Sequence, residues 1–137
     1  MDELAQLGEA EVRRVHVWLD LWLSGRCDDE ETLAPFTDAL HADFTLVAPS
    51  GVMRERRQVI EDVEGGRGAL GEDFVITIRK PSLRWATDDL LLVTYEEWQV
   101  LHGKDRGRLS SVLFLREGED AQRLSWLHLH ETWLPED

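Results

Sequence analysis

Hydrophobic residues recur at helical spacing near the start of the chain. Val12, Val15, Leu19 and Trp22 lie three or four residues apart, and Gly25 follows them. Apolar residues at this spacing form one face of an amphipathic helix, and glycine is a common residue just after a helix end. The stretch "GEAEVRRVHVWLDLWLSGR" therefore predicts a long helix with one buried face.

Two further helices are predicted before the pattern changes. The acidic run "DDEE" offers helix caps and favourable charge for a short second helix in "ETLAPFTDAL". Adjacent carboxylates repel and point apart, so this run indicates a solvated helix start rather than a metal site. In "RERRQVIEDVEGGRG", Val59, Ile60 and Val63 share one side of a third helix that ends at glycines.

The remainder of the chain reads as strands. "DFTLVAPSGVMRE" alternates and turns at Pro49–Gly51, which predicts a short hairpin. Four longer β segments follow: "DFVITIRKPSLRWAT", "LLLVTYEEWQVLHG", "RLSSVLFLREG" and "RLSWLHLHETWL". Short polar breaks between consecutive strands predict an antiparallel meander. Pro81 lies inside the first of these strands and predicts a bend or bulge near a sheet edge.

Composition and charge narrow the class of protein. The 137 residues are 42% hydrophobic and 31% charged, which suits a single domain over residues 1–137. A net charge of −13 repels phosphate backbones and anionic membranes, so we expect neither nucleic acid nor a membrane as a partner. The acidic start resembles no secretory signal, no apolar run could span a bilayer, and the lone Cys27 excludes an internal disulfide. We therefore expect a cytoplasmic protein.

The order of elements predicts an α+β fold in which a curved antiparallel sheet wraps a long N-terminal helix, with three helices in all. This order, together with "GKDRGRLSSVLF" leading into "WLHLHETWL", resembles the nuclear transport factor 2-like superfamily, also called the cystatin-like cone fold. The closing strand is most similar to small bacterial members related to SnoaL-type polyketide cyclases and to the association domain of calcium/calmodulin-dependent protein kinase II. The superfamily holds both enzymes and non-catalytic binding or assembly domains, so the fold alone does not choose a function.

Strand alternation predicts which side chains face the helix. On each of the last three strands we place the more aliphatic set on the concave face, where Tyr95, Glu97, Ser111 and Glu131 accompany it. With Trp133 they are the predicted ligand-binding residues of a pocket inside the cone. The resemblance places Glu131 where the kinase domain has a pocket arginine, so the expected ligand is a small neutral or cationic organic molecule. An ion pair of Glu131 with Arg84 or Arg79 is the structural alternative.

A catalytic role for this pocket is the alternative function. A desolvated Glu131 or Glu97 could act as general acid or base, and Tyr95 could donate a hydrogen bond to a developing oxyanion. Such an enzyme would be a cofactor-independent isomerase, dehydratase or cyclase. We expect no cofactor in either case.

The motif "HLHET" raises the possibility of a metal site. His128 and His130 share a strand face, but Glu131 points the other way, and a third ligand would have to be Glu96 or His102. We therefore expect no metal.

The opposite strand faces carry large rings. Trp98, Val112, Phe114, Trp126, His128 and His130 are assigned to one outer stripe, which predicts the contact of a two-fold homodimer. Coverage of this stripe by the third helix or by the C-terminal tail is the alternative.

Overall fold

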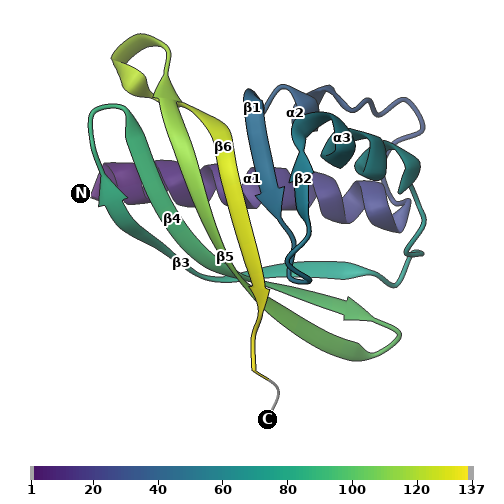
Figure 1. Ribbon diagram of the computed structural model, residues 1–137. Helices are drawn as coiled ribbons and strands as arrows, with labels where there is room; N and C mark the ends of the chain where they lie inside the picture. The colour runs from purple at the N-terminus through teal and green to yellow at the C-terminus, as the bar shows by residue number, and fades with distance from the viewer. Residues whose placement is uncertain (1, 136–137) are drawn as a thin grey trace.

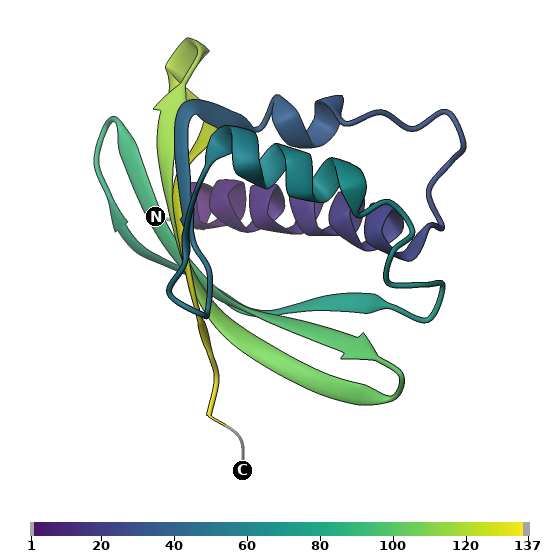
Figure 2. The same ribbon diagram turned by 45° about the vertical axis from the view of Figure 1, so that its right-hand side comes forward.

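The long N-terminal helix lies against the hollow side of a six-stranded sheet in a computed structural model that describes residues 2–135 (Figures 1 and 2). The α+β architecture with three α-helices confirms the predicted fold class. The elements are α1 (Asp2–Ser24), α2 (Ala34–Thr37), β1 (Leu40–Val47), β2 (Met53–Glu55), α3 (Arg56–Gly65), β3 (Val75–Ala86), β4 (Leu90–Leu101), β5 (Lys104–Glu117), the 3-10 turn η1 (Glu119–Ala121) and β6 (Arg123–Trp133).

The sheet is mixed rather than purely antiparallel. Its strand order is β2-β1-β6-β5-β4-β3, and strands β3 to β6 form the predicted antiparallel meander. β1 and β2 form the predicted hairpin, but β1 pairs with β6 in parallel. The chain can make this parallel contact because α3 and the meander separate the two strands in sequence.

Two sequence predictions about local structure have different outcomes. The second helix covers only Ala34–Thr37, since β1 already begins at Leu40, and Pro35 lies at the helix start where its missing N–H costs nothing. The expected irregularity around Pro81 is confirmed, because the β3–β4 register shifts between Arg79 and Ser82 on an edge strand.

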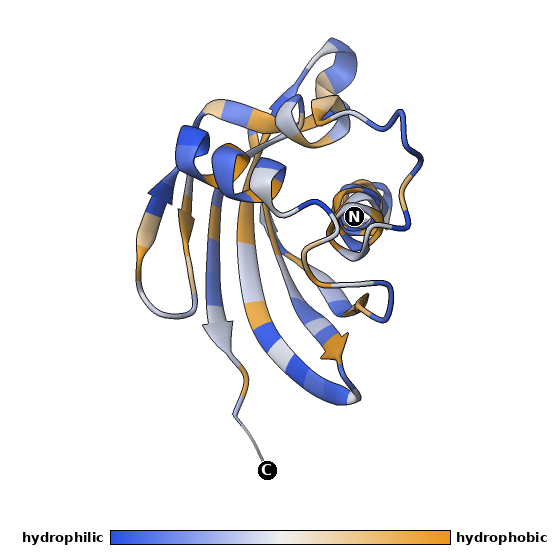
Figure 3. Cartoon of the chain, turned by 90° about the vertical axis from the view of Figure 1, so that its right-hand side faces the viewer, coloured by the Kyte–Doolittle hydropathy of each residue, from blue (hydrophilic) through white to orange (hydrophobic). Residues whose placement is uncertain are grey.

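The core lies between α1 and the inner face of the sheet. Figure 3, in which α1 is seen end-on, shows the helix on one side of the curved sheet and hydrophobic positions interspersed with polar ones along the strands. Val12 and Val15 of α1 and Leu91 and Val93 of β4 are buried there. The face assignment of β4 is thus confirmed, since Leu91, Val93, Tyr95 and Glu97 alternate with less buried neighbours.

The predicted faces of β5 were wrong. Ser110, Val112 and Phe114 are each 0% exposed, while Leu109 is 41% exposed. Their partners explain the arrangement, because Leu91 pairs with Phe114, Val93 with Val112 and Tyr95 with Ser110. Paired residues share a sheet face, so the buried set of β4 fixes the buried set of β5. The leucine-rich set that seemed suited to the core lies outside.

β6 contains a bulge, so its side chains do not alternate strictly between the two faces of the sheet. Phe114 pairs with Trp126, but the preceding Leu113 pairs with His128, so Leu127 is an extra residue in β6. The extra residue lets Trp126 and Glu131 face the same side although they lie five positions apart. Both are buried, at 2% and 6% exposure.

Candidate functional site: a cavity that ends in buried charged residues

A cavity of about 250 Å³ lies between α1, the sheet and the two short helices. Most of its lining is apolar and comes from every layer of the fold: Val15, Leu19, Leu23, Phe36, Leu40, Phe44, Leu46, Val59, Val63, Trp126 and Leu129. The polar lining residues are His16, Glu97, Gln99, Arg108 and Glu131. The cavity therefore has an apolar body and a strongly polar end.

His16 of α1 brings a cation to this end. Its Nδ1 donates to the Val12 carbonyl at 2.7 Å, and its Nε2 lies 3.0 Å from Glu97 Oε1. Burial alone would lower the pKa of His16, but the charge and hydrogen bond of Glu97 outweigh it and raise that pKa on balance. With both ring nitrogens donating, His16 is an imidazolium.

Glu97 of β4 is the central anion of the cluster. Its second oxygen, Oε2, accepts from Gln99 Nε2 at 2.6 Å, and Arg108 is its direct cross-strand partner. Burial would raise the pKa of Glu97, but the charges of His16 and Arg108 and the hydrogen bonds to this carboxylate lower it instead. Glu97 is therefore ionised and forms an ion pair with His16.

Arg108 of β5 joins the two carboxylates. Its Nη1 donates to Glu131 Oε1 at 3.0 Å, across the strand pairing that sets Ser110 beside Glu131. Burial and the negative charge of Glu97 raise the pKa of Glu131, while Arg108 opposes the rise. Glu131 is thus the carboxyl of the cluster that takes up a proton most readily.

Two hydroxyl groups lie buried beside this cluster. Tyr95 is 1% exposed and its strand partner Ser110 is 0% exposed. Among the described residues, neither Tyr95 Oη nor Ser110 Oγ has a hydrogen-bond partner. Burial and the nearby carboxylates raise the pKa of Tyr95 well above its usual value, so its phenol stays protonated.

The structure brings together part of the predicted ligand set. Glu97 and Glu131 line the cavity, and Tyr95 points to the same face behind them. Ser111 was placed wrongly, because it pairs with Thr94 and His130 on the outer face, and Ser110 takes the inward position. Trp133 is 36% exposed and lies under Arg106, whose Cζ is 3.5 Å from the ring centroid.

Three polar residues of the cavity were not predicted from the sequence: Arg108, His16 and Gln99. The partner of Glu131 is Arg108, whereas Arg84 donates to Thr94 Oγ1 and Arg79 stacks on Trp98. Arg108 could have been found from the pairing of β4 with β5, because the register of these two strands places Arg108 opposite Glu97.

Half of the predicted outer stripe lies in the core. Val112, Phe114 and Trp126 are at most 2% exposed within one chain, so they were wrongly assigned to a contact surface. His128 and His130 do lie on the outer side, with their ring centroids 6.4 Å apart. His128 Nδ1 lies 2.7 Å from Thr45 Oγ1 of β1, and Trp98 packs over Gly107.

Within residues 2–135, no group of three or more His, Cys, Asp or Glu side chains is arranged to hold a metal ion. The same range contains no helix that is long and apolar enough to cross a membrane.

Residues 8–135 match the family model described as sucrose-6-phosphate phosphohydrolase C-terminal, and the chain belongs to this family. The probable sucrose-phosphatase 3a of Arabidopsis thaliana is 27% identical over 128 residues, which cover 92% of this chain and 30% of the relative. Sucrose-phosphatase 2 of Nicotiana tabacum is 26% identical over 134 residues, with 90% and 30% covered. The chain thus spans about 30% of the length of these curated relatives.

Solved structures confirm the nuclear transport factor 2-like superfamily. An NTF-2-like protein of unknown function from Pseudomonas aeruginosa superimposes with a TM-score of 0.86 at 28% identity, covering 94% of this chain and 99% of that one. The CaMKII hub of S. rosetta matches with a TM-score of 0.67 at 15% identity, covering 91% and 95%. The CaMKII association domain of C. elegans matches with 0.65 at 18% identity, covering 90% and 93%.

Proposed function

We propose that this domain binds a small, mostly apolar organic molecule in the cavity of the cone and that it does so as a homodimer. The observation that supports binding is the combination of an apolar cavity of about 250 Å³ with a cluster of charged side chains at one end. Ligand sites in proteins are commonly apolar hollows with a few polar groups that fix orientation. An apolar cavity of roughly 150 Å³ is known to hold benzene, so this one suits a ligand of about ten non-hydrogen atoms.

The chemistry of the lining disfavours a sugar phosphate, although the curated relatives are named sucrose-phosphatases. A sugar needs a partner for each buried hydroxyl, and eleven of the sixteen lining residues are apolar. A phosphate would also bring two negative charges to a cluster in which Glu97 and Glu131 already match the charges of His16 and Arg108. An aromatic or aliphatic molecule with one polar end fits the lining better.

Acid–base catalysis is the alternative use of the same cavity. Glu131, with its raised pKa, would be the acid or base of an isomerase, dehydratase or cyclase. Binding is favoured because Glu131 is held by Arg108, and because Tyr95, the expected oxyanion donor, is not among the lining residues.

Benzamide should bind to the unmodified protein with saturation, as measured by ligand-detected NMR at pH 7.5. Val63→Phe should abolish this binding because the added ring fills the apolar body of the cavity. Val17→Phe is the matched control, since Val17 is 60% exposed on the outer side of α1, and it should bind benzamide normally. Equal binding by both variants, or no binding by the unmodified protein, would refute a ligand site in the cavity.

In our proposal, the outer face of the sheet forms the contact between the two chains of the dimer. We define this face by the outward residues of β4, β5 and β6: Leu92, Trp98, Leu109, Leu113, His128 and His130. Apolar side chains gathered on one side of a sheet commonly mark a protein contact. Two of the similar solved structures are named a CaMKII hub and a CaMKII association domain, and these names support self-association of this chain.

Light scattering at micromolar concentration should report a dimer for the unmodified protein. Leu113→Asp and His128→Asp should give monomers, because each buries a carboxylate without a partner in the contact. Val17→Asp adds the same charge to α1 and should remain dimeric. A monomeric unmodified protein, or dimers of both outer-face variants, would refute this interface.

A further inference from the structure

We propose that the cavity selects ligands whose polar end is uncharged and carries a hydrogen-bond donor beside an acceptor, as a carboxamide does. This inference rests on the proposed binding function and specifies the class of ligand. It follows from the sum of buried charges at the polar end and from the hydrogen-bonding groups that remain unused there.

The buried charges balance within the cluster. Each of four elements contributes one charged lining residue: His16 from α1, Glu97 from β4, Arg108 from β5 and Glu131 from β6. The lining residues from α2, α3 and β1 are all apolar, and Tyr95 behind the cluster stays neutral. Two cations therefore face two carboxylates.

A charged ligand would disturb this balance. The side chains of His16 and Glu97 are 5% and 7% exposed, and those of Arg108 and Glu131 are 17% and 7% exposed, so little water is present to compensate an added charge. An uncompensated charge at a buried site is strongly unfavourable, whereas a neutral polar group needs only hydrogen-bond partners.

Hydrogen-bond partners for a neutral polar group lie next to each other in the cluster. Within residues 2–135, the Arg108 side chain donates a single hydrogen bond, from Nη1 to Glu131 Oε1. Glu131 Oε2 accepts none from the same residues. A guanidinium with unused N–H groups beside a free carboxylate oxygen complements the C=O and N–H of one amide group.

Three probes of nearly equal size separate the charge classes: benzamide, benzoate and benzylammonium. Isothermal titration at pH 7.5 should give the unmodified protein at least a tenfold preference for benzamide over either ion. A charged probe that binds more tightly than benzamide, or three equal affinities, would overturn the inference and leave the binding function intact. The absence of binding by any probe would overturn the binding function itself.

Variants that change the net charge of the cluster should change which of the three probes gains affinity relative to the others. Glu131→Gln leaves one excess positive charge, so benzoate should gain at least tenfold relative to benzamide. Arg108→Gln leaves one excess negative charge, so benzylammonium should gain instead. The double variant restores balance and should prefer benzamide again.

A cooperative thermal unfolding transition verifies that each variant is folded before titration. If Arg108→Gln fails to fold, the benzoate preference of Glu131→Gln decides the question alone, because the isosteric amide can still accept from Arg108. An unchanged order of the three probes in folded Glu131→Gln would overturn the inference.

Discussion

Trp126→Ala should lower the free energy of unfolding by about 3–5 kcal/mol, as measured by urea denaturation. The indole is 2% exposed and packs edge-to-face on Phe114, with ring centroids 4.9 Å apart. Its Nε1 donates to Glu11 Oε2 on α1 at 2.9 Å, so the side chain also ties the sheet to the helix. Truncation would leave a void and remove this hydrogen bond, although Glu11 Oε2 would still accept from Arg14 Nη2.

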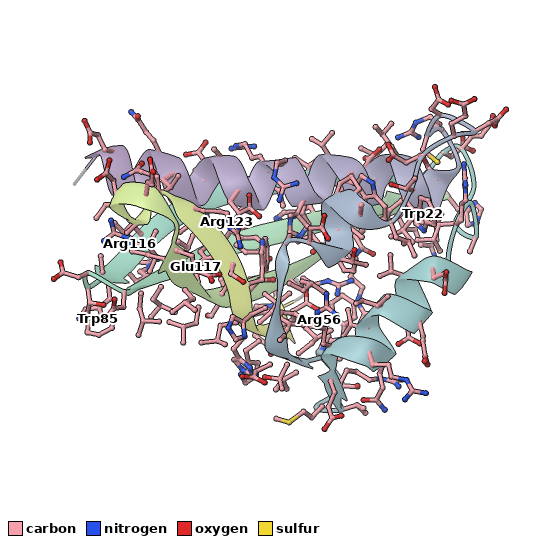
Figure 4. The ribbon with its side chains drawn as sticks, turned by 90° about the horizontal axis from the view of Figure 1, so that it is seen from above. Trp22, Arg56, Trp85, Arg116, Glu117 and Arg123 are labelled. Carbon is pink, nitrogen blue, oxygen red and sulfur yellow. The ribbon has the colours of Figure 1, made fainter. Side chains whose placement is uncertain are left out.

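Trp85→Ala is the matched control for this prediction. Trp85 lies at the end of β3, at the opposite end of the molecule from Trp22, and is 55% exposed (Figure 4). Its loss should change the free energy of unfolding by less than about 1 kcal/mol. If Trp126→Ala instead separated a dimer without destabilising the chain, the indole would belong to a contact surface and the assigned faces of β6 would be incorrect.

Arg108→Leu should cost about 3–5 kcal/mol of stability at pH 8, because it leaves Glu97 and Glu131 buried without their guanidinium partner. Without Arg108, the pKa of Glu131 should rise further above its value in the unfolded chain. The folded state then binds more protons than the unfolded state, so stability decreases with rising pH. The destabilisation should therefore be largest at pH 8 and should shrink as the pH falls towards 5.

Arg84→Leu provides the comparison for a guanidinium outside the cluster. Arg84 is exposed and donates to Thr94 Oγ1 on the outer face, so its loss should cost less than about 1 kcal/mol at either pH. Chemical denaturation of both variants at pH 5 and pH 8 gives the comparison. A pH-independent loss for Arg108→Leu would contradict the assigned role of Glu131.

The sequence predicted the elements because their hydrophobic periods are clear. It placed Leu91, Val93 and Glu97 of β4 on one face because strict alternation holds along this strand, which has no bulge against β5. It failed on β5 because both faces are rich in apolar residues, so local alternation could not choose between them. On β6 the extra residue Leu127 reverses the alternation, and nothing in "SWLHLHETW" marks the bulge.

The candidate site was half predicted for a related reason. Glu97 and Glu131 could be placed by strand alternation, a local property. His16 lies 81 residues from Glu97 in sequence, and Arg108 lies 23 residues from Glu131, so their pairing depends on how α1 and β5 are set in the fold. Nothing in the sequence around His16 indicates that its partner is Glu97, because the residues near it in an amphipathic helix do not depend on a contact so distant in sequence.

The location of bound benzamide distinguishes a ligand site in the cavity from binding to the outer face of the sheet. Intermolecular nuclear Overhauser effects between the benzamide ring protons and protein methyl groups report which surface the probe contacts. We expect contacts with the methyl groups of Val63 and Leu129, inside the cavity. Contacts with Leu92 and Leu113 on the outer face, and none with Val63 or Leu129, would contradict a ligand site in the cavity.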